Sequence, residues 1–238
     1  MRKAIRFVDS MIDKILVFVF ALCMLIGIYF IYDTAYVFYH ASSDRVTYYR
    51  PDSEPDMTEQ QGTRQFTKDY VAWLHLDNTT IDYPVMQGET NSKYLNMDPY
   101  GDYSLAGSIF LDSRNAKDFS DSYCLLYGHH MAEGLMFGAL DHYLDRTFFE
   151  QHQSGTLILA DRQYLLDVFA VLQTEASVKA LFDPNGSEEV LQLAKTESEF
   201  YREPSGTHII ALSTCRDANS LARTVVLAVM TETEEPIS

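Results

Sequence analysis

Three residues in the second half of the chain have the chemistry needed for nucleophilic acyl transfer. Cys215 ends the apolar run THIIALSTC, Arg223 begins the run ARTVVLAVM, and His129 follows the run SYCLLYG. A thiol attacks a carbonyl carbon only as the thiolate, which a neighbouring imidazolium stabilises. The same histidine can give a proton to a leaving amine, and an arginine, which is always charged, can hold an oxyanion.

These residues can converge only if neighbouring strands carry them. Cys215 and Arg223 are eight positions apart, so an antiparallel strand pair joined by a loop would put them on facing strand ends. Spacing alone leaves a structural interpretation open, in which Cys215 is a buried thiol or half of a disulfide with Cys124. The chain has only three cysteines, too few for a disulfide scaffold, and Cys23 lies in an apolar N-terminal run.

Short runs rich in β-branched and aromatic residues predict the strands that position this chemistry. They are VAWLHL, TTIDYPVM, GSIFLD, SYCLLYGHH, TLILA, YLLDVFAVLQ, THIIALSTC and ARTVVLAVM. Apolar residues at three- and four-residue steps predict an amphipathic helix in GLMFGALDHYLDRTFFEQH. A second helix is expected in SEEVLQLAKTESEFY, with Ser187 as its N-cap. Seven to eight strands with interposed helices predict a mainly β fold, a closed or nearly closed barrel.

The N-terminal segment has the composition of a membrane anchor. Arg2, Lys3, Arg6 and Lys14 precede an uncharged apolar run of 18 residues, 15–32. At about 1.5 Å per residue, this run is just long enough to cross a hydrocarbon core. The bulky GIYFIYD at its end does not resemble a signal-peptidase site. A buried core helix is the alternative, but basic residues on one side only favour an anchor with a cytoplasmic N-terminus.

Composition divides the chain further. We expect a cytoplasmic basic segment at 1–14, a transmembrane signal-anchor at 15–32 and an extracellular juxtamembrane helix and linker at 33–65. A folded domain that carries the chemistry is expected at 66–233, with a short tail at 234–238. The net charge of −16 excludes binding to nucleic acid by electrostatic attraction. No histidine shows the spacing of a metal ligand.

Four segments resemble, in the same order, those of class B sortases, the membrane-anchored cysteine transpeptidases of Gram-positive bacteria. They are IDYPVMQGETNSKYL, GSIFLDSRN, LLYGHHMAEGLMFGAL, and LSTC followed by ARTVV. Together they cover about residues 66–231, whereas LSTC alone would carry little weight. The resemblance implies a sortase-type β-barrel that works without a cofactor or a metal.

The resemblance also implies catalytic roles, residue by residue. It makes Cys215 the nucleophile, His129 the acid/base partner and Arg223 the contact to the oxyanion or the substrate backbone. Asp217, two residues past the cysteine, is expected to help position His129. Consecutive strand residues point to opposite faces, so His130 is not interchangeable with His129 and is expected in a supporting or solvent-exposed position.

Substrate contacts are expected, from the same resemblance, at Ser213, Asn91 and Tyr127. In the implied reaction, Cys215 attacks the threonine carbonyl of a C-terminal sorting motif in a surface protein and forms a thioester. An amine of a peptidoglycan cross-bridge then takes the acyl group; the alternative acceptor is a pilin lysine. The implied location is the cell membrane, crossed once through residues 15–32, with the catalytic domain outside the cell.

Two other readings of the same residues compete with a transpeptidase. A papain-like hydrolytic cysteine protease is disfavoured because His129 precedes Cys215 and no cysteine lies early at the head of a helix. A non-catalytic surface receptor would instead hold Cys215 in a disulfide with Cys124. The state of the Cys215 thiol separates the receptor from both enzymes, and capture of the acyl group by an added amine separates transferase from protease.

Overall fold

The computed structural model describes two compact units, Met1–Tyr39 and His40–Ser238. The residues described are 2–42, 50–51, 65–175, 177–215 and 222–233. Helix α1 (Arg2–Ala41) accounts for the first unit. Its segment Arg6–Tyr39 is by length and composition able to cross a membrane, with a mean hydropathy of 2.7 in its most apolar window, none of which is buried. A core helix would be buried, so this helix is a candidate anchor, longer than the predicted run.

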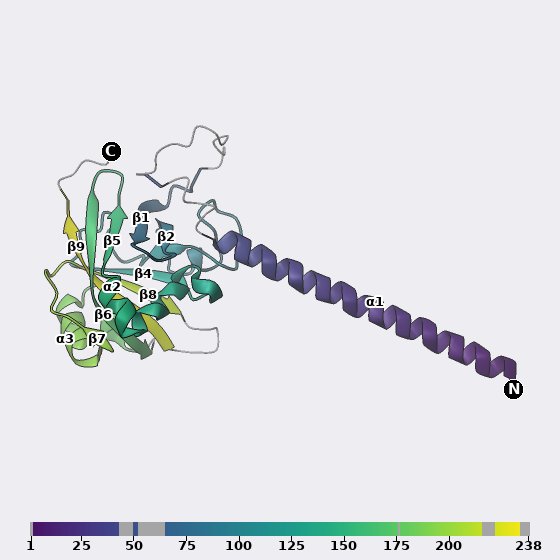
Figure 1. Ribbon diagram of the computed structural model, residues 1–238. Helices are drawn as coiled ribbons and strands as arrows, with labels where there is room; N and C mark the ends of the chain where they lie inside the picture. Colours follow the sequence, from purple (N-terminus) through teal and green to yellow (C-terminus); the bar gives the residue numbers. More distant parts are fainter. Residues whose placement is uncertain (1, 43–49, 52–64, 176, 216–221, 234–238) are drawn as a thin grey trace. The chain divides into compact units, whose positions relative to one another are not determined.

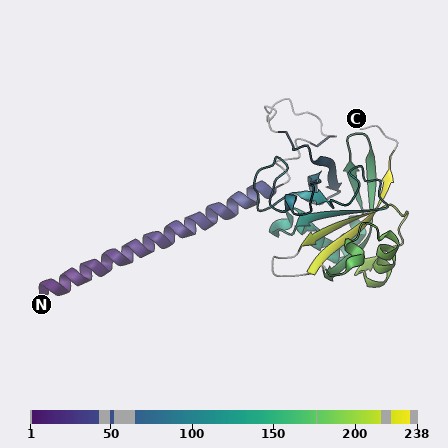
Figure 2. The same ribbon diagram turned by 180° about the vertical axis from the view of Figure 1, so that it is seen from behind.

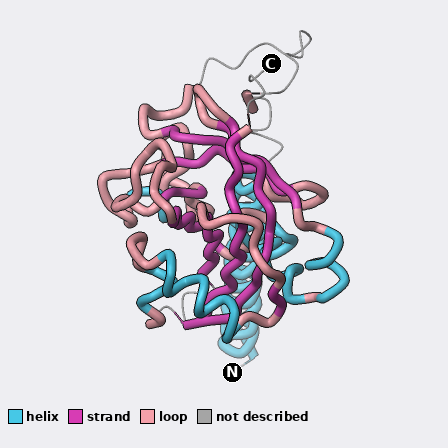
Figure 3. Tube along the Cα trace, turned by 90° about the vertical axis from the view of Figure 1, so that its left-hand side faces the viewer, coloured by secondary structure: helices cyan, strands magenta, loops and turns pink. Residues whose placement is uncertain are grey.

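The second unit is built on a closed ring of strands, which can be followed in Figures 1 and 2. In the part of the chain that the structure describes, the strand order is β5-β1-β2-β3-β4-β8-β9-β6-β7, and β5 pairs again with β6. That last pairing closes eight strands into a barrel and leaves β7 outside. The predicted barrel of seven to eight strands is confirmed. Figure 3 shows the strands at the centre of this unit, with loops and helical segments around them.

The strands have the following bounds. They are β1 (Tyr70–Leu76), β2 (Asp82–Met86), β3 (Ile109–Leu111), β4 (Tyr123–His129), β5 (Ser154–Ile158), β6 (Gln163–Glu175), β7 (Phe200–Tyr201), β8 (Ile209–Cys215) and β9 (Ala222–Glu232). The connecting segments contain η3 (Lys93–Leu95), η4 (Ala132–Gly134), η5 (Phe137–Leu144), α2 (Arg146–Gln151), η6 (Lys179–Phe182) and α3 (Ser187–Glu197).

The predicted helices differ in detail from those observed. The amphipathic segment after β4 is not one helix but the 3-10 segment η5 followed by α2. Asp145 breaks it, because its backbone is extended and its carboxylate accepts a hydrogen bond from the Phe148 amide at 3.0 Å. Ser187 is the first residue of α3 rather than its N-cap, a position that Gly186 occupies without a side-chain bond.

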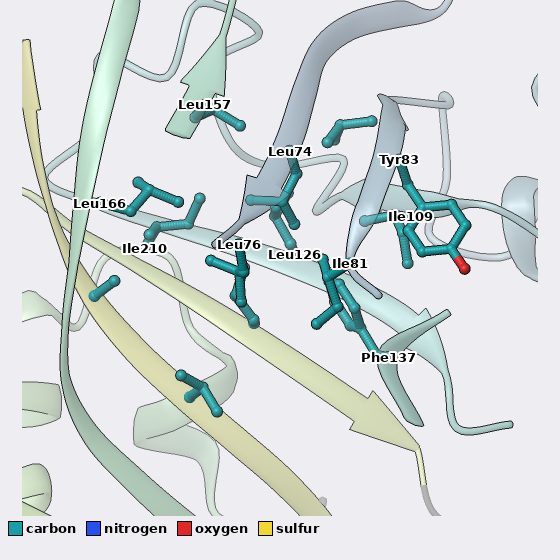
Figure 4. Packing of buried hydrophobic residues seen from close by; sticks show 14 of the residues in the cluster. Leu74, Leu76, Ile81, Tyr83, Ile109, Leu126, Phe137, Leu157, Leu166 and Ile210 are labelled. Carbon is teal, nitrogen blue, oxygen red and sulfur yellow. The ribbon is translucent and has the colours of Figure 1, made fainter. Parts of the chain in front are cut away.

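Two apolar layers cover the two faces of the barrel wall. Inside, side chains of β1, β3, β4, β5, β6 and β8 point toward one another, among them Leu74, Leu126 and Ile210 (Figure 4). Outside, Val190 and Ala194 of α3 pack with residues of β6, β8 and β9. A strand residue between these layers faces one of them, which sets the side on which each residue of the site lies.

Candidate active site

The ends of three adjacent strands bring the predicted catalytic residues together. Strands β4 and β8 are parallel, and His129 is the register partner of Cys215, the last residue of β8. Strands β8 and β9 are antiparallel and in register as far as Ser213 opposite Val225, so Cys215 and Arg223 each lie two residues beyond this pair on their own strand. Neighbouring strands lie about 4.8 Å apart, so the three backbones lie within roughly 10 Å of one another.

His129 has one ring nitrogen fixed by the backbone. Its Nε2 lies 2.7 Å from the carbonyl oxygen of Leu95, the last residue of η3. A carbonyl oxygen only accepts hydrogen bonds, so Nε2 carries a proton and Nδ1 is the nitrogen left to exchange one. Leu95 was not among the predicted site residues, because its contribution is a main-chain atom that side-chain patterns do not reveal.

A pocket of about 320 Å³ lies beside this strand end. It contains three predicted site residues, Asn91, Tyr127 and Arg223, and four that the sequence did not single out. The complete lining is Asn91, Ser92, Leu95, Phe110, Tyr127, Phe182 and Arg223. Three aromatic rings and one leucine lie beside an amide, the hydroxyl groups of Ser92 and Tyr127 and one cation, a lining suited to an extended peptide with both apolar and polar side chains.

Arg223 is held over two aromatic rings. Its guanidinium carbon lies 5.0 Å from the ring centroid of Phe182 and 6.0 Å from that of Tyr127. Both distances are within the range of a cation–π attraction. No carboxylate among the described residues forms an ion pair with Arg223, so within that part of the chain its charge remains available to a bound anion.

Ser213, which was predicted to contact substrate, does not line the pocket. Ser213 lies on β8 in register with Tyr127 and is fully buried, and its Oγ has no hydrogen-bond partner among the described residues. It is therefore closed to a ligand in this conformation. Asp217, expected to help position His129, lies outside the described residues.

His130 has a different environment from His129. Its Nε2 lies 2.9 Å from Oδ2 of Asp141 in η5, and Oδ1 of Asp141 accepts a hydrogen bond of 2.6 Å from the buried hydroxyl of Thr224. The two adjacent histidines thus bond to different partners, as the alternation of strand faces requires.

The structure does not support a disulfide between Cys124 and Cys215. Cys124 is a free, buried thiol, and its register partner on β8 is Ile210. Cys215 lies five positions beyond Ile210 on β8, about 16 Å at 3.3 Å per residue, whereas the Cα atoms of a disulfide lie less than about 7 Å apart. The interpretation as a non-catalytic surface receptor required this disulfide and is therefore not supported.

Comparisons with known proteins agree with this architecture. The Sortase domain family model matches residues 74–231. Sortase B of Staphylococcus aureus is 33% identical over 177 residues, which cover 71% of this chain and 72% of that protein. A Streptococcus pyogenes class B sortase involved in pilus biogenesis has a TM-score of 0.64 at 38% identity, covering 70% of this chain and 94% of that chain. A Staphylococcus aureus sortase B–substrate complex has a TM-score of 0.65 at 32% identity, covering 71% of this chain and 82% of that chain. The chain therefore belongs to the sortase family, and its class B relatives support transpeptidase activity.

Proposed function

We propose that this protein is a membrane-anchored cysteine transpeptidase that uses Cys215 as nucleophile, His129 as acid/base and Arg223 as the contact to the developing oxyanion. The observation that carries the proposal is the pairing of His129 with Cys215 at the ends of β4 and β8, beside β9, whose second residue is Arg223. The adjoining pocket, with Asn91 and Tyr127 in its wall, would hold the sorting motif of a surface protein.

The reaction has two halves that use the same groups in reverse order. The thiolate of Cys215 attacks the threonine carbonyl carbon, and the resulting oxyanion is stabilised by the guanidinium of Arg223. The C–N bond breaks as His129 gives a proton to the leaving amine, and a thioester remains. An incoming amine then attacks the thioester and loses its proton to His129, and the thiolate leaves. Nδ1 is the nitrogen that makes both transfers, because Nε2 is bonded to the Leu95 carbonyl.

The acceptor in this proposal is an amine of cell-wall peptidoglycan. The 38% identity to a class B sortase involved in pilus biogenesis favours testing a pilin lysine as well. Helix α1 would cross the membrane once, with its basic N-terminal residues in the cytoplasm and the barrel outside. Surface proteins and their acceptor would then meet the enzyme at the membrane surface.

Transpeptidation can be tested with the full chain in detergent micelles. The protein is incubated with a library of sorting peptides and, in separate reactions, with hydroxylamine, oligoglycine or a lysine peptide. We expect an acyl-enzyme and a new amide or hydroxamate with the parent protein, detected by mass spectrometry. Cys215→Ala should keep its circular dichroism spectrum and form neither product. Equal turnover by both proteins would exclude the proposal, and peptide cleavage that ignores every amine would indicate a protease instead.

A further inference from the structure

We propose that Asp112 and Arg114 form a positioning unit for the pocket, which holds the two aromatic rings that carry the guanidinium of Arg223. Asp112 directly follows β3, and Arg114 lies two residues further along. Neither residue lines the pocket, so they act through residues that do. The inference rests on the proposed function only where it assigns a catalytic consequence to the position of Arg223.

The carboxylate of Asp112 is fully buried and is the centre of a hydrogen-bond network. The Arg114 side chain binds it with both arms of its fork, Nε to Oδ1 at 2.9 Å and Nη2 to Oδ2 at 2.8 Å, and the Arg114 amide adds a bond of 3.0 Å. A buried carboxylate needs such pairing, because an isolated one would be costly to desolvate. The planar fork of arginine also fixes orientation in a way that lysine cannot.

Two pocket residues donate to the same carboxylate. Oδ2 of Asp112 accepts from the Tyr127 hydroxyl at 3.1 Å and from Asn91 Nδ2 at 2.9 Å. The Asn91 amide is also held at its other end, since its Oδ1 accepts from the Ser113 amide at 2.7 Å. Burial, followed by the Asp112 charge and hydrogen bond, raises the pKa of Tyr127, so its hydroxyl stays protonated and remains a donor. Asp112 therefore fixes one wall of the pocket.

Arg114 extends the network to the opposite ring. Its Nη2 also donates to the carbonyl oxygen of Phe182 at 2.7 Å, a contact between residues 68 positions apart. Phe182 is the last residue of the four-residue segment η6. A hydrogen bond to its backbone carbonyl holds the main chain from which the Phe182 ring projects. Tyr127 and Phe182, the two rings over which Arg223 lies, are thus both tied to one ion pair.

This arrangement predicts that the position of Arg223 depends on Arg114 through the two rings, without direct contact between the two arginines. The informative variant is Arg114→Lys, which keeps the charge but loses the fork and the reach to Phe182. The Arg114 side chain is 53% exposed, so the folded barrel can accommodate the change. The matched control is Arg162→Lys, because Arg162 makes the same two-armed contact with Asp161 at an exposed site.

The first readout does not depend on activity. In the full chain, labelled with ¹⁵N-arginine in micelles, the Nε–H resonance of Arg223 is assigned by its loss in Arg223→Lys. We expect this resonance to lie away from those of exposed arginines in the parent, because of the two rings, and to move toward them in Arg114→Lys. Arg162→Lys should leave it in place. An unchanged Arg223 resonance in a folded Arg114→Lys protein would overturn the proposal.

The second readout is a double-mutant cycle on peptide transpeptidation. Arg114→Lys should lower kcat/KM by about tenfold in the parent, less than the roughly hundredfold that a misplacement of a catalytic group by about 1 Å can cost. In the Arg223→Lys background the same change should alter kcat/KM by less than about twofold, since the positioned guanidinium is gone. Equal losses in both backgrounds would show that Arg114 acts independently of Arg223, and the proposal would be wrong.

The proposal can still be tested if Arg114→Lys does not fold or if the parent protein shows no transpeptidation. If Arg114→Lys does not fold, Tyr127→Phe replaces it, because that change removes only the hydroxyl that donates to Asp112. A shifted Arg223 resonance in Tyr127→Phe would then support the proposal. An unchanged resonance would contradict it. If the parent shows no transpeptidation with any peptide, the proposed function fails, whereas the resonance of Arg223 still decides whether the ion pair positions it.

Discussion

Cys124 and Cys215 lie on neighbouring strands, and the Cys124 thiol is buried. The Cys124 thiol is enclosed in the apolar interior and lies 3.6 Å from the carbonyl oxygen of Asp121. Burial, with smaller contributions from the charges of Asp121 and Asp118, raises the pKa of Cys124 to about 12. At pH 7.5 only on the order of one such thiol in ten thousand is ionised. Cys215, by contrast, has a histidine as its register partner.

This difference predicts selective alkylation. In a Cys23→Ala background, which removes the thiol of α1, iodoacetamide at pH 7.5 should label the folded protein once, at Cys215, as read by peptide mass spectrometry. Cys124 should react only after denaturation, because its thiolate is both rare and inaccessible. Adding Cys215→Ala should leave the folded protein unlabelled. Rapid labelling of Cys124 in the folded state would contradict the burial on which this expectation rests.

At the scale of elements, Asp141 ties η5 to two of the strands that carry the site. Its two oxygens bind His130, next after β4, and Thr224, the third residue of β9. Each of these follows a proposed catalytic residue by one position in the chain. The Thr224 hydroxyl is fully buried, so loss of its acceptor leaves a polar group unpaired.

Asp141→Ala should therefore lower the free energy of unfolding by about 1–3 kcal/mol, the usual penalty for a buried polar group without a partner. Asp141→Asn keeps an acceptor oxygen for Thr224 and should lose less. Urea titration followed by circular dichroism measures both. The exposed Asp161→Ala serves as control, with an expected change within about 0.5 kcal/mol. If Asp141→Ala lowers the free energy of unfolding no more than the control does, the hydrogen bonds of Asp141 to His130 and Thr224 do not contribute to stability.

Strands were easier to predict than helices in this chain. β-branched and aromatic content identified the barrel strands as short apolar runs, because both faces of the wall are covered by apolar layers. The segment from Phe137 to Gln151 misled the periodicity argument, since steps of three and four residues over two turns fit a 3-10 segment as well as an α-helix. Only the capping carboxylate of Asp145 marked the break.

Some residues of the candidate site could be predicted from the sequence and others could not. Asn91, Tyr127 and Arg223 could be found from local motifs, and they meet in the pocket. Phe182 could not, because its place depends on a contact between residues 68 positions apart. The sequence shows only that a carboxylate directly follows the run IFL and that an arginine lies two residues later. The partners of this pair, however, come from segments distant in sequence.

For the molecule as a whole, several ionised carboxylates contribute to stability at neutral pH. Burial works to raise the pKa of Asp112, but hydrogen bonds from Arg114 and Asn91 outweigh it and lower that pKa. Burial likewise opposes bonds from His75 and Trp73 at Asp82, whose pKa is also lowered. A carboxyl group with a lowered folded-state pKa stabilises the protein above its unfolded pKa, about 3.9, and this contribution is lost as pH falls through the folded value.

Measuring the free energy of unfolding at acidic pH tests whether these carboxylates stabilise the folded protein. The free energy of unfolding should fall as the pH drops below about 4, in part because Asp112 and Asp82 become protonated. Asp112→Asn should have a lower free energy of unfolding than the parent at pH 7, and the difference should narrow as the pH falls toward 2.5 and the parent carboxyl takes up a proton. Urea titrations at pH 7, 5, 4, 3 and 2.5 provide the comparison. A difference that stays constant over this range would show that folding does not lower the pKa of Asp112.

The position of β8 inside the closed ring has a consequence for how such an enzyme can diversify. β8 is hydrogen-bonded to β4 on one side and to β9 on the other, so the end that carries the proposed nucleophile cannot be moved without opening the barrel. The pocket walls come partly from η3 and η6, segments of three and four residues that lie outside the ring. New peptide preferences should therefore arise by exchange of these short segments, while the strand that bears the thiol is inherited unchanged.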